Sequence, residues 1–204
     1  MKLYNSIGPN PRLVRMFAAE KDMVLTLVDL DILGPAENRK EPFLSLNPTG
    51  NTPVLLLDDG SALAETVAIC EYLEETCPGP KLIGNTPQQR AFTRMWVRRA
   101  EQLVKDPMTA GFRGAEGLDL FRDRVPCLPH ASADFKQITQ QSLDWFEAQI
   151  GERPFIVGDM FTLADIVLFC FVEFGALVGQ GLAPRHARLS AWHARIAARP
   201  SAAA

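Results

Sequence analysis

The sequence predicts an α/β domain followed by an all-helical domain. Up to residue 77, short apolar strand patterns alternate with amphipathic helix patterns. A cluster of chain-breaking residues, Cys77-Pro78-Gly79-Pro80, then interrupts the alternation. After this cluster, every regular pattern has the period of a helix. We therefore expect a first domain at 1–77, a linker at 78–87 and an all-helical domain at 88–204.

The first half is predicted to open with a β-α-β unit. Lys2 to Asn5 has the pattern of a short strand, Pro11 to Lys21 that of an amphipathic helix, and Val24 to Leu30 that of a second strand. Such a unit pairs its strands in parallel through a right-handed crossover. The elements expected next are an irregular helix or loop at 35–45, a buried strand at 54–57, a hairpin turn at Asp58-Asp59-Gly60, a strand at 61–63 and a helix that opens at Glu65-Thr66.

The second half is predicted to form a helical bundle. The helices expected are 88–112, 132–150, 162–178 and a last one marked by Leu189, Trp192 and Ile196, with a broken connection at 114–130. The first of them should bend at Pro107, because proline removes a helical hydrogen bond. The helix at 162–178 is apolar nearly all round, which is typical of a helix at the centre of a bundle. Thr162 and Asp165 predict a capping box at its start.

Composition excludes several kinds of partner and site. The 204 residues carry a formal net charge of −3, so a nucleic acid is not expected as the main partner. The most apolar stretch, 166–172, is too short to span a bilayer, and no N-terminal signal pattern is present.

The four cysteines show no metal-type spacing, which favours reduced thiols in a cytoplasmic protein. Three histidines lack carboxylates at metal spacing, so we predict no metal site and expect them at the surface: His130, His186 and His193.

The segment from Asn47 to Leu73 carries the features of a site for a small acidic peptide. Thr52-Pro53 precedes a buried strand, where a proline marks an edge, a start or a bend. A cis bond there would turn the Thr52 backbone outward, so that its N–H and C=O could pair with an extended ligand. Glu65-Thr66 opens a helix whose N-terminus attracts a carboxylate, while the Glu65 carboxylate can take an ammonium group. The alternative is that Glu65 and Thr66 only cap the helix.

These motifs, in this order, resemble the glutathione-binding half of the glutathione transferase superfamily, whose usual sequence is Val-Pro-x-Leu, then Asp-Gly, then Glu-Ser-x-Ala-Ile. Here Thr52 occupies the position of the valine and keeps its main-chain N–H, and Thr66 occupies the position of the serine and keeps its hydroxyl. The Thr162/Asp165 pair and the ending Leu-Ser-Ala-Trp-His-Ala-Arg-Ile are also similar to the superfamily, so the likeness spans both halves. The resemblance implies a thioredoxin-like fold for 1–77, glutathione as cosubstrate and a homodimer.

The resemblance also implies where glutathione binds. The tripeptide would lie along Asn51-Thr52-Pro53, with its γ-glutamyl end at Glu65 and Thr66. Its glycine carboxylate would meet Lys40 or Asn38, where related enzymes place such contacts, and Asn51 would hydrogen-bond the same end. The alternative for Lys40 is a solvated loop charge.

Several groups are candidates for activating the thiol. Glutathione reacts as its thiolate, so donors should converge where the first strand meets the first helix. In the loop Ser6-Ile7-Gly8-Pro9-Asn10, the family's catalytic serine position falls on Gly8 and its cysteine position on Asn10. The remaining candidates are the Asn10 amide, the helix N-terminus, Ser6, and Thr109 and Arg113 after the expected bend. A structural role is the alternative for each side chain: a loop cap, a bond within the loop, a kink-side hydroxyl or a solvated charge.

The predicted function is a glutathione transferase that conjugates the thiolate to a small hydrophobic electrophile. The electrophile would bind beside the helix that holds Met108, Thr109 and Phe112. One alternative is a glutathione-dependent disulfide reductase, because Pro9-Asn10 resembles a pair in the nu class. Another is a non-catalytic binding or scaffold protein, because the usual activating side chain is missing.

Overall fold

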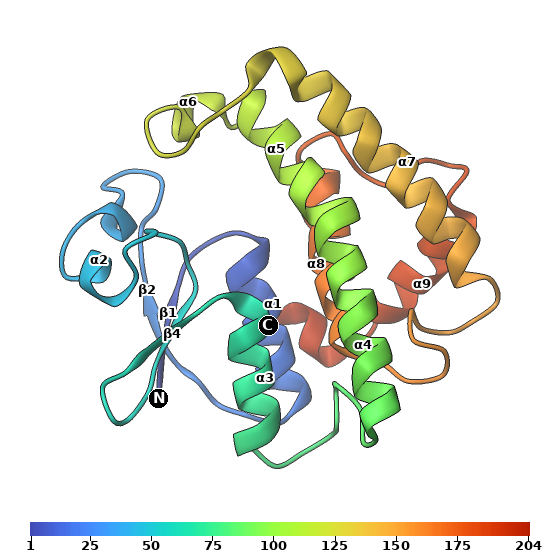
Figure 1. Ribbon diagram of the computed structural model, residues 1–204, viewed down its shortest axis with the longest axis horizontal. Coiled ribbons are helices and arrows are strands. Elements are labelled where there is room, and N and C mark those ends of the chain that lie inside the picture. The colour runs from blue at the N-terminus through green and yellow to red at the C-terminus, as the bar shows by residue number, and fades with distance from the viewer. The chain divides into compact units, whose positions relative to one another are not determined.

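The computed structural model describes residues 1–204, which form two compact units. The first unit comprises residues 1–82 together with 200–204, and the second comprises 83–199. The first holds a small sheet with flanking helices and the second is helical (Figure 1). The predicted fold class, a thioredoxin-like domain followed by a helical domain, is confirmed.

The first unit is built on a four-stranded sheet with the order β2-β1-β3-β4. The strands are β1 (Lys2–Asn5), β2 (Thr26–Asp29), β3 (Val54–Leu56) and β4 (Ala62–Ala64). β1 pairs with β2 in parallel, as a β-α-β opening requires, and with β3 antiparallel. β3 and β4 form an antiparallel hairpin in which Val54 faces Ala64. Gly60 in the turn has φ +87°, a conformation that glycine adopts without strain.

Two helices, α1 (Pro9–Glu20) and α3 (Thr66–Thr76), pack side by side against the sheet (Figure 1). Their apolar faces supply most of this unit's core, together with buried residues of β1 and β3. The short helix α2 (Phe43–Leu46) and a 3-10 turn (Glu37–Arg39) form the connection between β2 and β3. A second 3-10 turn, Pro200–Ala203, returns to this unit and contacts α1.

A buried ion pair ties the end of the first unit to its core. Lys21 Nζ lies 3.0 Å from Glu74 Oε2, and both side chains are fully buried. Lys21 also donates to the Pro80 carbonyl, while Glu74 accepts from the Leu82 amide. These additional bonds satisfy the charges that burial removes from water, and they hold the chain after α3 in place.

The second unit is a bundle of helices. They are α4 (Pro87–Arg99), a π-helical segment (Ala100–Lys105), α5 (Asp106–Gly114), α6 (Leu118–Phe121), a 3-10 turn (Pro129–Ala131), α7 (Ser132–Ile150), α8 (Leu163–Leu177) and α9 (Ala187–Ala197). The expected bend at Pro107 takes the form of the π-helical segment directly before it. Because Pro107 has no N–H, the preceding turn loses a regular donor, and a π-turn re-pairs the backbone.

The helix α8 is the core element of the bundle, as its nearly all-round apolar sequence predicts. Its capping box is formed by Thr162 and Asp165, whose backbone and side chains bond reciprocally. The Asp165 carboxylate also accepts from the Ile156 amide and from Trp192 Nε1, both at 2.9 Å. One buried side chain thereby joins the start of α8 to the preceding loop and to α9.

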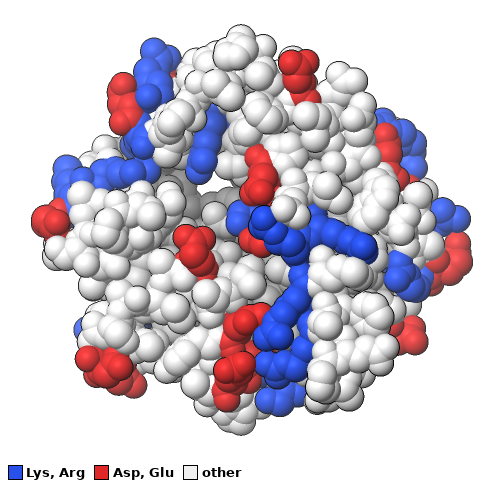
Figure 2. All heavy atoms as spheres, viewed as in Figure 1, with Lys and Arg blue, Asp and Glu red and all other residues white.

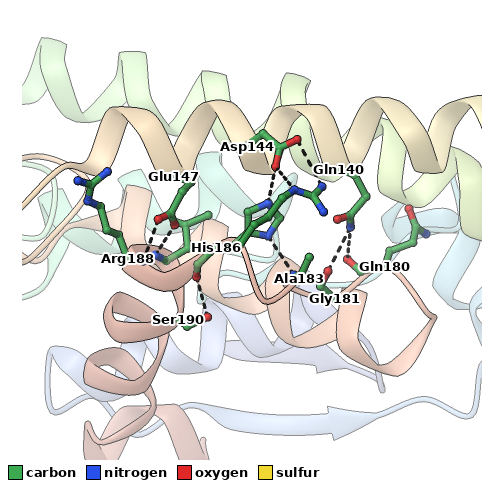
Figure 3. A network of polar contacts seen from close by, with 11 residues as sticks. Gln140, Asp144, Glu147, Gln180, Gly181, Ala183, His186, Arg188 and Ser190 are labelled. Atoms are coloured by element: carbon green, nitrogen blue, oxygen red, sulfur yellow. Dashed lines mark hydrogen bonds and ion pairs between the residues drawn. The ribbon is translucent and has the colours of Figure 1, made fainter.

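A polar network fastens α9 to α7 (Figure 3). Glu147 of α7 accepts from the amides of Arg188 and Leu189, which are orphan donors in the first turn of α9. His186, the N-cap residue of α9, donates from Nε2 to Asp144 of α7, since its Nδ1 accepts from a backbone amide.

The expectation of three surface histidines is wrong for His186, which is fully buried. Its ring spans a loop amide and an acid of a neighbouring helix, a tertiary arrangement that no spacing in the sequence shows. His130 is exposed, as expected. His193 is partly buried and bonds to Glu173 while its ring lies against Phe169.

Charged side chains of both signs are interspersed over the face shown in Figure 2, as the composition predicts, with a band of basic groups along α4. Arg90, Arg94 and Arg98 are four residues apart and so share one face of that helix. None of the helices is long and apolar enough to cross a membrane. No disulfide joins the cysteines, and no cluster of His, Cys, Asp and Glu could hold a metal ion.

Candidate functional site

The segment before β3 presents an unpaired stretch of backbone. The Thr52-Pro53 peptide is cis. Neither the N–H nor the C=O of Thr52 makes a hydrogen bond within the chain, although its neighbour Asn51 is bonded on both sides. Asn51 donates its amide to Thr49 and accepts from the Asn47 side chain through its carbonyl. The vacant donor and acceptor of Thr52 can therefore pair with the backbone of an extended ligand.

A close packing contact supports this segment from behind. Asn38 is buried and donates from Nδ2 to the Gly50 carbonyl at 2.6 Å. Gly50 has φ +65°, and a Cβ there would lie 2.9 Å from the Arg39 guanidinium and 3.0 Å from the Asn38 carbonyl. Asn38 thus supports the loop, whereas Lys40, the other candidate for the ligand's glycine carboxylate, is exposed.

Glu65 lies next to the Thr52 segment in the sheet. The antiparallel β3–β4 register pairs Val54 with Ala64. Continuing this register by one position, beyond the ends of the two strands, places Pro53 opposite Glu65. Glu65 has φ +69° and ψ +119°, a strained conformation for a residue with a Cβ. Strain of this kind persists where the surrounding structure imposes it, and it clusters at functional sites.

The Glu65 carboxylate is not used as a helix cap. It is exposed and makes no side-chain hydrogen bond to the first turn of α3, and no ion pair to it exists within the chain. The capping alternative is therefore absent from the structure. Thr66, the first residue of α3, is buried, and the N–H groups of this first turn are the positive end of the helix dipole. A negative and a positive site thus adjoin each other.

The loop between β1 and α1 offers few donors. Gly8 is the N-cap of α1 with φ +115°, and the next positions include Pro9 and Pro11, which have no N–H. Asn10 lies between these prolines in the first turn, and no side-chain capping bond is formed. The Asn10 Oδ1 atom is buried and has no hydrogen-bond partner. The loop-cap alternative for Asn10 is not what the structure shows.

The remaining candidates of the first unit differ in their surroundings. Ser6 is buried and bonded to the Ile7 carbonyl and to the Thr52 hydroxyl, so it bonds its own loop, as the structural alternative expected, and a second loop as well. Lys40 is exposed, and its ammonium group has no partner within the chain. The Asn51 side chain is also exposed and makes no hydrogen bond. Both are accessible to a ligand carboxylate.

Thr109 and Arg113 belong to the second unit, on consecutive turns of α5. Both are partly buried. The Arg113 guanidinium lies over the ring of Phe121 of α6, with 5.0 Å from Cζ to the ring centroid. Phe121 packs edge-on against Phe112, which does the same with Phe174 of α8. Arg113 therefore has an aromatic platform and is not the solvated charge that the alternative proposed.

Comparison with known families decides what kind of protein contains this arrangement. Residues 7–76 match the model of the glutathione S-transferase N-terminal domain, and residues 129–195 match that of the C-terminal domain. The chain belongs to the glutathione S-transferase family of enzymes. The first match contains the Thr52 and Glu65 segments described above, and the second contains α7 and α8 with the Asp165 cap.

Relatives of this glutathione S-transferase family member extend over nearly the whole chain. It is 34% identical to glutathione S-transferase 2 of Saccharomyces cerevisiae over 200 residues, which is 95% of this chain and 84% of the yeast protein. The crystal structure of yeast Gtt2 superposes with a TM-score of 0.91 at 32% identity and covers 98% of each chain. A glutathione S-transferase from Methylobacillus flagellatus, solved with GSH bound, has a TM-score of 0.83 at 26% identity and covers 98% of this chain and 96% of that one.

Proposed function

We propose that this glutathione S-transferase family member binds glutathione and transfers its thiolate to a small hydrophobic electrophile. The observation that carries the proposal is the unpaired backbone of Thr52 beside the uncapped carboxylate of Glu65. A vacant N–H and C=O suit a peptide, and an unpaired carboxylate suits its ammonium group. Glutathione has both, with a γ-glutamyl linkage that separates them.

Each end of the tripeptide has a candidate partner in the first unit. The Thr52 N–H and C=O would pair with the cysteinyl backbone, and Glu65 with the γ-glutamyl ammonium. The γ-glutamyl carboxylate would meet Thr66 at the N-terminus of α3. Lys40 and Asn51, which have unpaired side chains, would meet the glycine carboxylate.

The side chain best suited to stabilise the thiolate is Asn10. Its amide lies in the first turn of α1, where the helix dipole also favours a negative sulfur, and its buried oxygen has no partner. Thr109 and Arg113 remain proposed contributors from α5, through a hydroxyl and a positive charge. Ser6 is proposed to position the loop without touching the sulfur. A homodimer, a cytoplasmic location and a role in detoxification belong to the same proposal.

A titration and two assays test the proposed function. Isothermal calorimetry should show saturable binding of glutathione to the purified protein. A nitro-substituted aryl chloride should then be conjugated faster than a low-molecular-weight disulfide is reduced. Faster reduction would favour the disulfide reductase, and binding without either turnover would favour a non-catalytic protein. No binding of glutathione would contradict the transferase and the disulfide reductase, and would leave only the non-catalytic scaffold protein.

Replacing Asn10 with alanine should raise the pKa of the bound glutathione thiol and lower the conjugation rate about tenfold at neutral pH, as expected for the loss of one hydrogen bond to a charged group. The affinity for glutathione should change little, because the tripeptide backbone contacts remain. Thiolate absorbance against pH measures the thiol pKa. The same measurement on Thr109→Val and Arg113→Gln identifies any contribution from α5. An unchanged thiol pKa in Asn10→Ala would show that this amide is not the donor.

A further inference from the structure

Two hydroxyl groups from distant parts of the chain meet at the candidate site. Ser6 Oγ lies 2.6 Å from Thr52 Oγ1, although 46 residues separate the two in sequence. The β1–β3 register explains the contact: Tyr4 pairs with Val54, so continuing that register brings Ser6 opposite Thr52. Ser6 is 5% exposed, which protects the contact from competing water.

The direction of the hydrogen bonds follows from the number of protons. Ser6 Oγ also lies 3.1 Å from the Ile7 carbonyl, which can only accept. Because a hydroxyl has a single proton, both contacts are made at once only if Ser6 donates to Ile7 and Thr52 donates to Ser6. The result is a chain of hydrogen bonds that runs from the Thr52 side chain to the Ile7–Gly8 peptide.

This chain of hydrogen bonds orients one of the few amide donors of the β1–α1 loop. A trans peptide unit is planar, so its C=O and N–H point in opposite directions. A bond that fixes the Ile7 carbonyl toward Ser6 therefore fixes the Gly8 N–H away from Ser6. The Gly8 N–H makes no hydrogen bond within the chain, and Pro9 offers none.

We propose that the hydroxyls of Thr52 and Ser6 form a positioning pair that aligns the Gly8 amide with the glutathione sulfur. The pair joins the segment that holds the tripeptide backbone to the loop that faces its thiol, so the ligand and the thiolate donor are placed by the same contact. Neither hydroxyl touches the sulfur. The inference rests on the proposed binding of glutathione, and it gives Ser6 a positioning role in place of the catalytic role considered from sequence.

Substitutions that keep the shape of the side chains test the pair. Thr52→Val replaces the hydroxyl with a methyl group and leaves the Thr52 backbone in place. We expect it to lower kcat about fivefold, the usual effect of one neutral hydrogen bond, with the KM for glutathione within about twofold. The pKa of the bound thiol should rise by about 0.7 unit, which corresponds to the same fivefold change. Thr52→Ser, which restores the hydroxyl, should return the thiol pKa toward that of the wild type.

The second half of the test is a double-mutant cycle. Ser6→Ala should reproduce the changes of Thr52→Val, and the double variant should be no worse than either single variant, because all three break the same chain. Thr76→Val is the matched control: its hydroxyl donates to the Tyr72 carbonyl and lies 3.6 Å from Cys77 Sγ, both at the far end of α3, and the variant should leave the thiol pKa unchanged. A thiol pKa unchanged in both single variants, or additive effects in the double variant, would overturn the pairing. A wild-type protein that binds no glutathione would instead overturn the proposed function.

Discussion

Replacing Glu65 with alanine is expected to weaken glutathione binding about 100-fold, because a charge-assisted hydrogen bond is lost and the ligand's ammonium group is left unpaired. The Glu65 carboxylate has no partner within the chain, so nothing else in the protein depends on its charge. The strained backbone at this position, with φ +69°, places the side chain beside the Thr52 segment. Calorimetric titration of glutathione into wild type and variant gives the ratio of the two dissociation constants.

Two controls separate this effect from a general loss of charge or of fold. Glu152→Ala removes another exposed carboxylate, from the other unit, and should leave glutathione binding unchanged. A glutathione analogue without the γ-glutamyl amine should bind the wild type and Glu65→Ala with similar affinity, because the contact is already missing from the ligand. If the analogue distinguishes the two proteins as strongly as glutathione does, Glu65 does not hold the ammonium group.

The parts of the fold that local patterns determine were predicted correctly. A short strand pattern marks β1, alternation marks β2, the Asp58-Asp59-Gly60 turn marks the β3–β4 hairpin, and a nearly all-round apolar pattern marks the buried helix α8. In each case the backbone choice follows from neighbours a few residues away. The Thr162/Asp165 capping box is local in the same sense, since its partners are three residues apart.

The features that could not be predicted depend on contacts between distant residues. The pairing of Ser6 with Thr52 requires the β1–β3 register, and the burial of His186 requires α7 to lie beside the start of α9. The π-helical segment before Pro107 was expected only as a bend, because a proline specifies the missing donor but not how the chain re-pairs. For Glu65, sequence allowed both a cap and a ligand contact; only the backbone torsions and the absence of a capping bond separate them.

The Asp165 side chain concentrates four hydrogen bonds in the core of the second unit. Its carboxylate accepts from the amides of Ile156 and Thr162, from the Thr162 hydroxyl and from the Trp192 indole, at 2.9 to 3.2 Å. Replacing Asp165 with alanine would leave these donors buried without an acceptor and would open a cavity. We expect the free energy of unfolding of the second unit to fall by about 4 kcal/mol.

Chemical denaturation followed by Trp fluorescence measures this loss. Asp119→Ala is the matched control in the same unit, because Asp119 is exposed and paired only with the exposed Arg122; its effect should stay within about 0.5 kcal/mol. Trp192→Phe removes one donor and also part of a fully buried ring, so it should cost about 2 kcal/mol, still less than Asp165→Ala. Equal midpoints for Asp165→Ala and Asp119→Ala would contradict the central role of the carboxylate.

The same carboxylate should make stability depend on pH. Burial raises the pKa of Asp165 from the ordinary 3.8 to about 6, against the opposing effect of its hydrogen bonds. Between these pH values the folded state holds a proton that the unfolded state has released. The stability that the protonated Asp165 contributes is therefore fully present below about pH 4 and is lost as the pH rises toward 6.

A shift of about two pKa units corresponds to about 3 kcal/mol. Asp165→Asn cannot ionise, so the free energy of unfolding of the wild type should fall by about that amount relative to Asp165→Asn between these pH values. A constant difference between the two proteins over this range would show that Asp165 is already ionised at pH 4.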